Sequence, residues 1–145
     1  MKHLTLELAL FALLAGCTYK TKPPAPPPSQ DHALTLSWNQ SFANNPPCSS
    51  TVVTSCISGF NTGTLTGTTP TQLHNDPAGV CSGATQPEAC TTTYNAQLPI
   101  GSITFYVETT FVDQNGAAGV TARTTTASPV AVAADTPSSL TVTVK

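Results

Sequence analysis

Five cysteines carry the most versatile chemistry in this chain of 145 residues, and their number is odd. Cys48 and Cys56 lie eight positions apart, Cys81 and Cys90 lie nine apart, and Cys17 stands far from the other four. Zinc sites use a much shorter spacing between paired cysteines. The chain also lacks the C-x-x-C pair that is typical of redox catalysts. These spacings therefore predict neither a metal site nor a cofactor.

Histidines and acids offer a second set of reactive groups. His74 and Asp76 lie two positions apart in "HNDP", and with one of the many serines they could form a hydrolase triad. However, the chain has no G-x-S-x-G turn. We interpret His74 as a solvated histidine in a turn-rich loop, and His32 as exposed. Adding His32 or His74 to the cysteines would give a metal site of unusual spacing, which we do not expect.

The remaining acids give no sign of a catalytic pair. Glu88 and Glu108 fall on different predicted elements, so two cooperating carboxylates are not expected. Asp113 and Asn115 could contribute oxygens to a calcium ion, but two such residues do not make a site. The "DQNG" segment, residues 113–116, is better explained as a hairpin turn.

Composition points to an all-β protein outside the nucleic-acid-binding classes. Only 8% of residues are charged and the formal net charge is −2, so the chain has no basic footprint for nucleic acid. Threonine runs suit half-buried strands because threonine is β-branched. Thirteen prolines and nine glycines interrupt the chain often, which argues against long helices.

The first sixteen residues have the pattern of an export signal. Lys2 supplies a positive charge, and an uninterrupted apolar run of eight residues follows at positions 8–15. This run is far too short to span a bilayer. Glu7 is unusual so close to an apolar run, but it falls at the boundary between the two regions.

The end of this run, Leu14-Ala15-Gly16-Cys17, resembles the lipobox of bacterial lipoproteins. The resemblance implies cleavage before Cys17, which becomes an acylated amino terminus that carries palmitate or similar chains. Two or more acyl chains anchor a protein stably to a membrane. Thr18 in place of an aspartate implies an outer-membrane destination in a diderm bacterium. An ordinary secretory signal with an incidental cysteine is the alternative.

Residues 17–31 are predicted to form the lipidated cysteine and a proline-rich linker. Positions 23–28 hold five prolines and one alanine, which favours an extended polyproline II tether of about 3.1 Å per residue. Such a tether would hold a domain about 2–4 nm from the membrane. A ligand for a proline-recognising domain is the alternative interpretation. Lys20 and Lys22 either contact anionic head groups or are solvated.

Residues 32–145 are predicted to form one antiparallel β-sandwich. In "HALTLSW", Leu34, Leu36 and Trp38 alternate with small polar residues, as in a half-buried strand. "SITFYVETTFVD" alternates in the same way, with Glu108 on the outward face, and "SSLTVTVK" closes the chain. Weaker strands are expected around residues 56–65 and 90–96. Several short strands separated by turns indicate a sandwich.

The segments "HALTLSW", "ISGF" and "TTTYNAQLPIGSITFYVETTFVDQNG" resemble strands B, C, E and F of a fibronectin type III domain. The resemblance covers about residues 32–128 and implies an immunoglobulin-like sandwich with Trp38 in its core. Phe105 replaces the corner tyrosine of that family, and "FNTGT" breaks the expected alternation of strand C. No clear first strand precedes Ala33, and the segment after Ser128 is longer than one final strand requires. A different immunoglobulin-like topology therefore stays open.

The four cysteines after Cys17 have a simple interpretation in an exported chain, because disulfides persist outside the cytoplasm. Four cysteines allow three connectivities. We favour the local pairs Cys48–Cys56 and Cys81–Cys90, each of which would close a loop with little apolar content.

The sequence thus predicts a lipid-anchored module of the bacterial cell envelope that faces the periplasm or the exterior. Its work is expected to be non-catalytic: binding a protein or glycan partner through loops at one end, or supporting an envelope assembly. Phe42, Phe60 and Tyr94 either form an exposed patch or cap the core. A carbohydrate-docking module and a small secreted hydrolase are the alternative functions.

Overall fold

The computed structural model of the chain describes residues 22–26, 28–43, 45–48, 55–83, 85–121 and 123–145. The predicted signal segment, Cys17 and Lys20 lie outside the described residues, so their predicted roles stay predictions. Within the described part, regular structure is almost entirely β, and no helix is long and apolar enough to cross a membrane.

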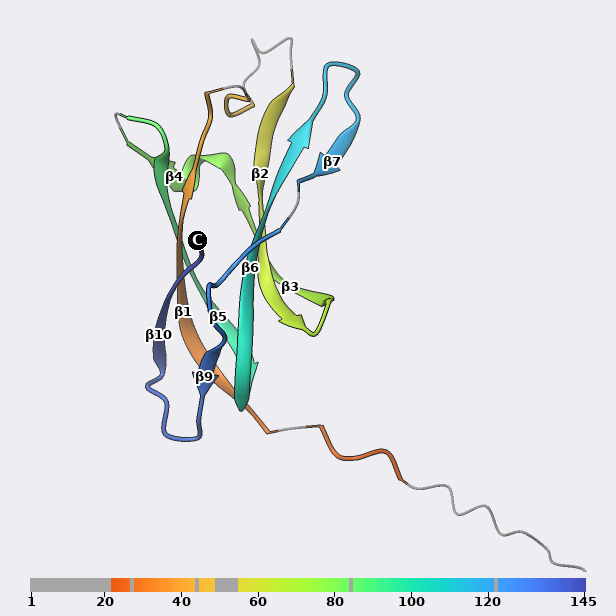
Figure 1. Ribbon diagram of the computed structural model, residues 1–145, viewed down its shortest axis with the longest axis vertical. Helices are drawn as coiled ribbons and strands as arrows, with labels where there is room; N and C mark the ends of the chain where they lie inside the picture. Colours follow the sequence, from red (N-terminus) through yellow and green to blue (C-terminus); the bar gives the residue numbers. More distant parts are fainter. Residues whose placement is uncertain (1–21, 27, 44, 49–54, 84, 122) are drawn as a thin grey trace, which may run out of the picture.

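Two facing sheets build the molecule (Figure 1). One sheet has the order β10-β1-β5-β4, and the other has the order β3-β2-β6-β7, with β8 and β9 also paired to β6. The elements are β1 (Ser29–Gln40), β2 (Cys56–Thr66), β3 (Thr69–Pro77), the single 3-10 turn η1 (Ala78–Val80), β4 (Cys81–Ser82), β5 (Glu88–Pro99), β6 (Gly101–Val112), β7 (Ala118–Val120), β8 (Thr124–Thr125), β9 (Val130–Val132) and β10 (Ser139–Thr143). The all-β sandwich predicted from the sequence is confirmed.

Strand β1 is an inner strand of the first sheet, between β10 and β5. It pairs with β5 in antiparallel register from Ser29 to Gln40, and so begins inside the range predicted as linker. Its apolar residues Leu34, Leu36 and Trp38 are buried, as their alternation predicts. The alternation works because successive side chains of a strand point to opposite faces.

The last strand departs from a purely antiparallel sandwich. β10 runs parallel to β1, paired from Ala33 with Ser139 to Ser37 with Thr143. The reason is the path of the chain, which leaves β9 on the second sheet and crosses to the first through residues 133–138. The surplus residues after Ser128 therefore supply β9 and β10, and β10 occupies the edge beside β1.

The β6–β7 connection is the hairpin predicted from "DQNG". The Asp113 carboxylate accepts hydrogen bonds from the backbone N–H groups of Asn115 and Ala117, both at 2.8 Å. Gly116 has φ 80°, a left-handed conformation that glycine adopts without strain. These bonds lower the pKa of Asp113, because they stabilise its charged form.

Glu108 lies on the outer face of β6, as the alternation predicts, but this face is covered, which corrects the expectation of a side chain that faces solvent. Tyr106 and Glu108 are only 2% and 7% exposed. Arg123 lies across them, with Nη2 at 2.7 Å from Glu108 Oε1 and Cζ at 5.3 Å from the centre of the Tyr106 ring. Strand periodicity could not reveal this cover, because Arg123 follows β7 in a separate segment.

The core lies between the sheets. It includes aromatic residues that the sequence analysis placed either in an exposed patch or at the edge of the core. Phe42 and Phe60 are buried, and Phe60 packs edge-to-face against Trp38 with ring centres 5.1 Å apart. His32, predicted to be exposed, is also buried, because the β9–β10 connection covers it. Its Nδ1 donates a hydrogen bond to the carbonyl oxygen of Pro137 at 2.9 Å.

Candidate functional site

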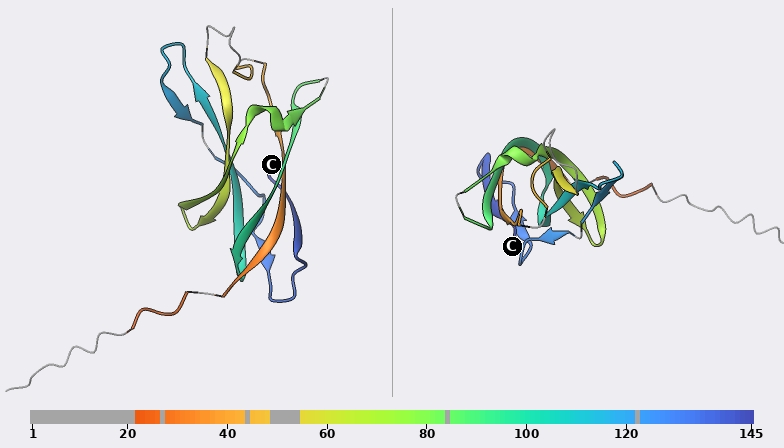
Figure 2. Two further views of the ribbon diagram at one scale, coloured as in Figure 1. Left: turned by 180° about the vertical axis from the view of Figure 1, so that it is seen from behind. Right: turned by 90° about the horizontal axis from the view of Figure 1, so that it is seen from above.

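The two ends of the sandwich are built differently. The tether joins the start of β1 at one end, and the connections β1–β2, β4–β5 and β6–β7 gather at the opposite end (Figures 1 and 2). Both disulfides, Cys48–Cys56 and Cys81–Cys90, lie toward that opposite end, where β2 and β5 begin. The local pairing predicted from the sequence is confirmed, and we call this region the distal end.

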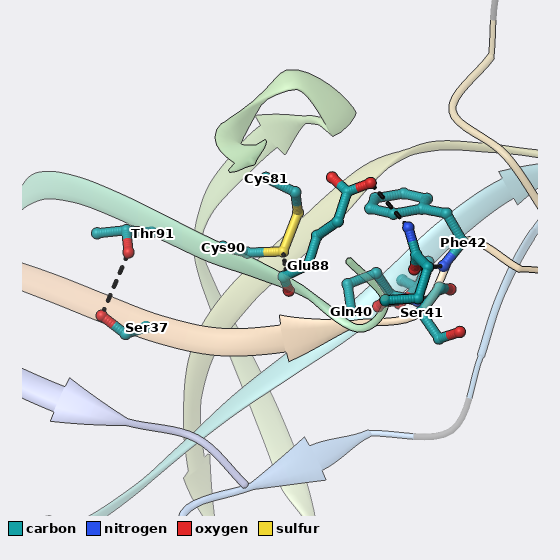
Figure 3. The surroundings of a disulfide bond; sticks show 10 residues. Ser37, Gln40, Ser41, Phe42, Cys81, Glu88, Cys90 and Thr91 are labelled. Atoms are coloured by element: carbon teal, nitrogen blue, oxygen red, sulfur yellow. Dashed lines mark hydrogen bonds between the residues drawn. A yellow bond between two sulfur atoms is a disulfide. The ribbon is translucent and has the colours of Figure 1, made fainter. Parts of the chain in front are cut away.

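The Cys81–Cys90 disulfide closes the β4–β5 connection over the distal end (Figure 3). Cys81 and Cys90 face each other directly across the two strands. Within the loop they close, the Gln86 amide oxygen accepts the backbone N–H of Phe42 at 2.7 Å, and its Nε2 donates to Glu88 Oε1 at 2.8 Å. The loop thereby fixes the start of the β1–β2 connection.

The Cys48–Cys56 disulfide fastens the other end of the β1–β2 connection. The backbone N–H of Cys48 donates to the Ile57 carbonyl, and the backbone N–H of Ile57 donates to the Pro46 carbonyl, both at 2.8 Å. Both described ends of this long connection are therefore held against the sheets. A loop held in this way can present side chains with little loss of entropy on binding.

A hollow of about 200 Å³ opens at the distal end, and we call it the distal hollow. Ile57 and Phe111 give it apolar surface, while the other lining side chains are neutral and polar: Gln40, Ser41, Asn45, Ser55, Thr109 and Thr121. None of the described residues that line it carries a charged side chain. Such a surface suits a neutral partner that exchanges hydrogen bonds.

A second hollow of about 280 Å³ adjoins the first along the long side between β1 and β6, and we call it the edge groove. Its lining is Trp38, Asn39, Gln40, Val107, Thr109, Thr124, Thr143, Val144 and Lys145. Gln40 and Thr109 line both hollows, and Thr109 Oγ1 donates to Gln40 Oε1 across the sheets at 2.9 Å. Sequence reasoning missed these two residues, although each continues an inward-facing apolar row with a polar side chain.

His74 and Asp76 lie elsewhere, on the opposite long side of the sandwich. They belong to strand β3, which corrects their interpretation as residues of a turn-rich loop. Asp76 is 3% exposed and accepts a hydrogen bond from Thr92 of β5 at 2.5 Å. His74 Nε2 lies 3.4 Å from the same carboxylate oxygen, and its ring stacks on Tyr94 of β5 with centres 4.6 Å apart.

Tyr94 completes this contact between the sheets. Its hydroxyl accepts a hydrogen bond from Thr62 Oγ1 of β2 at 3.1 Å. Burial of the ring raises the pKa of Tyr94 to about 12, so the phenol is neutral at ordinary pH. We call Thr62, His74, Asp76, Thr92 and Tyr94 the polar seam.

The polar seam has the composition of a catalytic site but the contacts of a structural one. Thr92, the hydroxyl bonded to Asp76, is engaged with the acid rather than with His74. Neither His74 nor Asp76 is among the described residues that line the distal hollow, the edge groove or the hollow beside His32. No group of three or more histidines, cysteines or acids suited to a metal ion occurs among the described residues.

Surface aromatics bear on the carbohydrate-docking alternative. Among the residues that the structure describes, Val120 is the one large hydrophobic side chain that is exposed. Sugar rings are commonly held by stacking on exposed aromatic faces. The described surface does not contain the row of aromatics that this alternative requires.

Comparison with protein-family models, with curated proteins and with solved structures gives no match to this chain. The candidate site therefore rests on its own geometry.

Proposed function

We propose that the chain is a lipid-anchored, non-catalytic binding module of the bacterial envelope, which contacts a protein or glycan partner with its distal end. The observation that carries this proposal is the position of the two disulfides, which brace the loops at the end opposite the tether. Bracing of this kind is expected where loops must keep one shape for recognition.

Anchoring is the part of the proposal that rests on the sequence. Leu14-Ala15-Gly16-Cys17 supplies the acylated residue, and the proline-rich segment supplies a stiff spacer. The disulfides support an oxidising compartment outside the cytoplasm. The twelve residues of β1 add about 40 Å between the tether and the distal end. The distal hollow would thus face away from the bilayer.

A fibronectin type III-like arrangement is part of the same proposal. The antiparallel pairing of β1 with β5 and of β2 with β6 supports it, since these are the segments that resemble strands B, E, C and F. The parallel β10 beside β1 is a departure from that family. Domains of this architecture commonly bind through loops at one end.

Anchoring is tested by substituting Cys17 in the full chain expressed in a diderm bacterium. Cys17→Ala should abolish labelling with a palmitate analogue and release the protein from the membrane pellet, because the anchor depends on its thiol. Thr18→Ala is the matched control and should stay labelled and membrane-bound. Continued pelleting of the Cys17→Ala chain, with an unlabelled parent, would refute the anchor.

The binding end is tested by photo-crosslinking in intact cells. A photo-reactive side chain at Asn45, which lines the distal hollow, should capture a discrete partner. The same group at Ala134, an exposed residue in the β9–β10 connection near the tether, should not. Capture from Ala134 but not from Asn45 would reverse the assignment of the binding end.

A further inference from the structure

Strand β1 is longer than the strand that covers its outer edge. β10 pairs with β1 only from Ala33 to Ser37, whereas β1 continues to Gln40. Figure 1 shows β10 ending beside the middle of β1, below the distal loops. In the described part of the chain, residues 38–40 have no strand partner on that side.

The hydrogen bonds between β1 and the chain around β10 show which backbone groups of β1 point toward this edge. The N–H of Ala33 and the C=O of Ser37 point toward β10, where they bond Ser138 and Val144. Backbone groups of a strand alternate in direction with a period of two residues. The N–H and C=O of Asn39 therefore point to the same side of β1 as those of Ala33 and Ser37. This is the side on which the edge groove lies.

A buried donor beside this edge also lacks an acceptor. Trp38 is 5% exposed and lines the edge groove, and its Nε1–H has no hydrogen-bond partner in the structure. Buried N–H groups without an acceptor are rare and costly, so they call for an explanation. The Nε1 atom is itself shielded from solvent, so an oxygen acceptor of a molecule bound in the groove would reach this donor after a rotation of the indole ring.

We propose that the edge groove binds an extended peptide segment of a partner protein as an added strand along Trp38–Gln40, in line with β10. The inference rests on the proposed binding function and assigns its partner class. Strand addition matches an unpaired backbone edge that continues an existing strand interface. Side chains of the peptide would alternate between solvent and the surface formed by Val107 and Val144.

Charge and chemistry narrow the peptide further. Among the described residues that line the groove, Lys145 is the one with an ionisable side chain, so a neutral or acidic segment fits and a basic one does not. A side chain with an oxygen acceptor, pointing into the groove, would take the Trp38 N–H. A glycan has no peptide backbone that could pair with the N–H and C=O of Asn39. We therefore propose a peptide as the ligand.

The experiment uses the single tryptophan of the chain as its reporter. Random short peptides displayed on phage are selected on the full chain held in detergent, and enriched sequences are synthesised. They should shift the indole N–H resonance of Trp38 and slow hydrogen exchange of the Asn39 amide. The enriched set should be neutral or acidic with alternating apolar residues.

Two substitutions at Asn39 distinguish the contribution of its backbone N–H to peptide binding from that of its side chain. Asn39→Pro removes the edge N–H and should weaken peptide binding about tenfold or more. Asn39→Ala keeps that N–H and should bind like the parent chain. Trp38→Phe should weaken binding of peptides that carry an acceptor at the inward position. Hydrogen exchange on the parent chain decides the matter even if Asn39→Pro fails to fold.

The inference would be wrong if no peptide were enriched, or if peptides slowed hydrogen exchange only around the distal hollow. It would also be wrong if a folded Asn39→Pro chain bound peptides as tightly as the parent, or if the chain self-associated through this edge. Membrane anchoring plays no part in the detergent assay. A negative result here together with intact palmitate labelling and distal crosslinking would therefore remove the peptide groove and leave the proposed function standing.

Discussion

Polar side chains lie between the two sheets along both long sides of the sandwich, but they close one side and leave the other open. Between β3 and β5, the polar seam joins the sheets through two hydroxyl hydrogen bonds and a stacked histidine. On the other side, in the described part of the chain, a hydrogen bond from Thr109 to Gln40 joins β6 to β1, and a long backbone bond of 3.4 Å runs from Lys145 to the Thr125 carbonyl. Two hollows open around these bonds. One side is sealed and the other is open.

The side chains of the most reactive types therefore lie on one long side, and the hollows that we propose as binding surfaces lie on the other. The sealed side contains the histidine, aspartate and tyrosine that would first suggest catalysis, yet their contacts hold strands together. The open side contains an amide, hydroxyls and an indole. Among the described residues, each side has a buried polar atom without a hydrogen-bond partner, Asp76 Oδ2 on the sealed side and Trp38 Nε1 on the open side, but Trp38 lines the edge groove. Binding capacity follows unsatisfied groups beside a hollow rather than the intrinsic reactivity of side chains.

The largest expected effect comes from a methyl group placed inside the sealed side. A Cβ at Gly59 of β2 would lie 2.2 Å from the backbone oxygen of Asp76 on β3. Backbone atoms cannot move aside as a flexible side chain can, so β3 would have to shift. We expect Gly59→Ala to lower the free energy of unfolding by about 3 kcal/mol or more, measured by urea denaturation.

Gly79 provides the matched control for this substitution. It lies in η1, on the connection from β3 to β4, and a Cβ there would meet no atom within 4 Å. Gly79→Ala should be neutral or stabilising by up to about 1 kcal/mol, because it only restricts the unfolded chain. Equal losses at both glycines would contradict the close approach of β3 to β2.

The second prediction compares one hydroxyl on each side. Thr92→Val removes the donor to the Asp76 carboxyl group and should cost about 2–3 kcal/mol in urea denaturation, because the acceptor that loses its hydrogen bond is buried. Thr109→Val removes the donor to Gln40, which is partly exposed and can bond water instead. Its cost should be about 1 kcal/mol or less. If Thr109→Val were the more damaging change, the open side would be the structural one.

Much of this architecture could be predicted from the sequence, for identifiable reasons. Leu34, Leu36 and Trp38 define a buried face by alternation alone, and "DQNG" defines its hairpin by local turn chemistry. The two disulfides could also be predicted, because both loops have little apolar content and benefit from closure. These features depend on residues close together in the chain.

The features that escaped prediction depend on segments far apart in the chain. His74 and Asp76 lie among turn-forming residues, but pairing with β2 draws them into a strand. Glu108 is covered by Arg123, and His32 is covered by the β9–β10 connection. On the open side, the described part of β10 pairs with β1 only as far as Ser37, while β1 continues to Gln40. No local pattern encodes where that strand ends relative to its neighbour.

The smallest predicted effect tests the sealed side through pH. The pKa of Tyr94 is about 12 in the folded chain, against 10.0 for an ordinary tyrosine, chiefly because burial disfavours the phenolate. A raised pKa means that the folded state holds this proton more tightly than the unfolded state does. The corresponding stability is fully present below pH 10 and is lost as pH rises through the window from 10 to about 12.

Tyr94→Phe should reduce this alkaline loss without removing it. Tyr106 also has a raised pKa, because its ring is buried beneath Arg123 near Glu108, and it keeps contributing in the variant. Brief urea denaturation at several alkaline pH values, with recovery checked at neutral pH to exclude disulfide damage, measures the slope for each chain. A slope unchanged by Tyr94→Phe would mean that the Tyr94 phenol is open to solvent, and the side between β3 and β5 would then be no better sealed than the groove opposite.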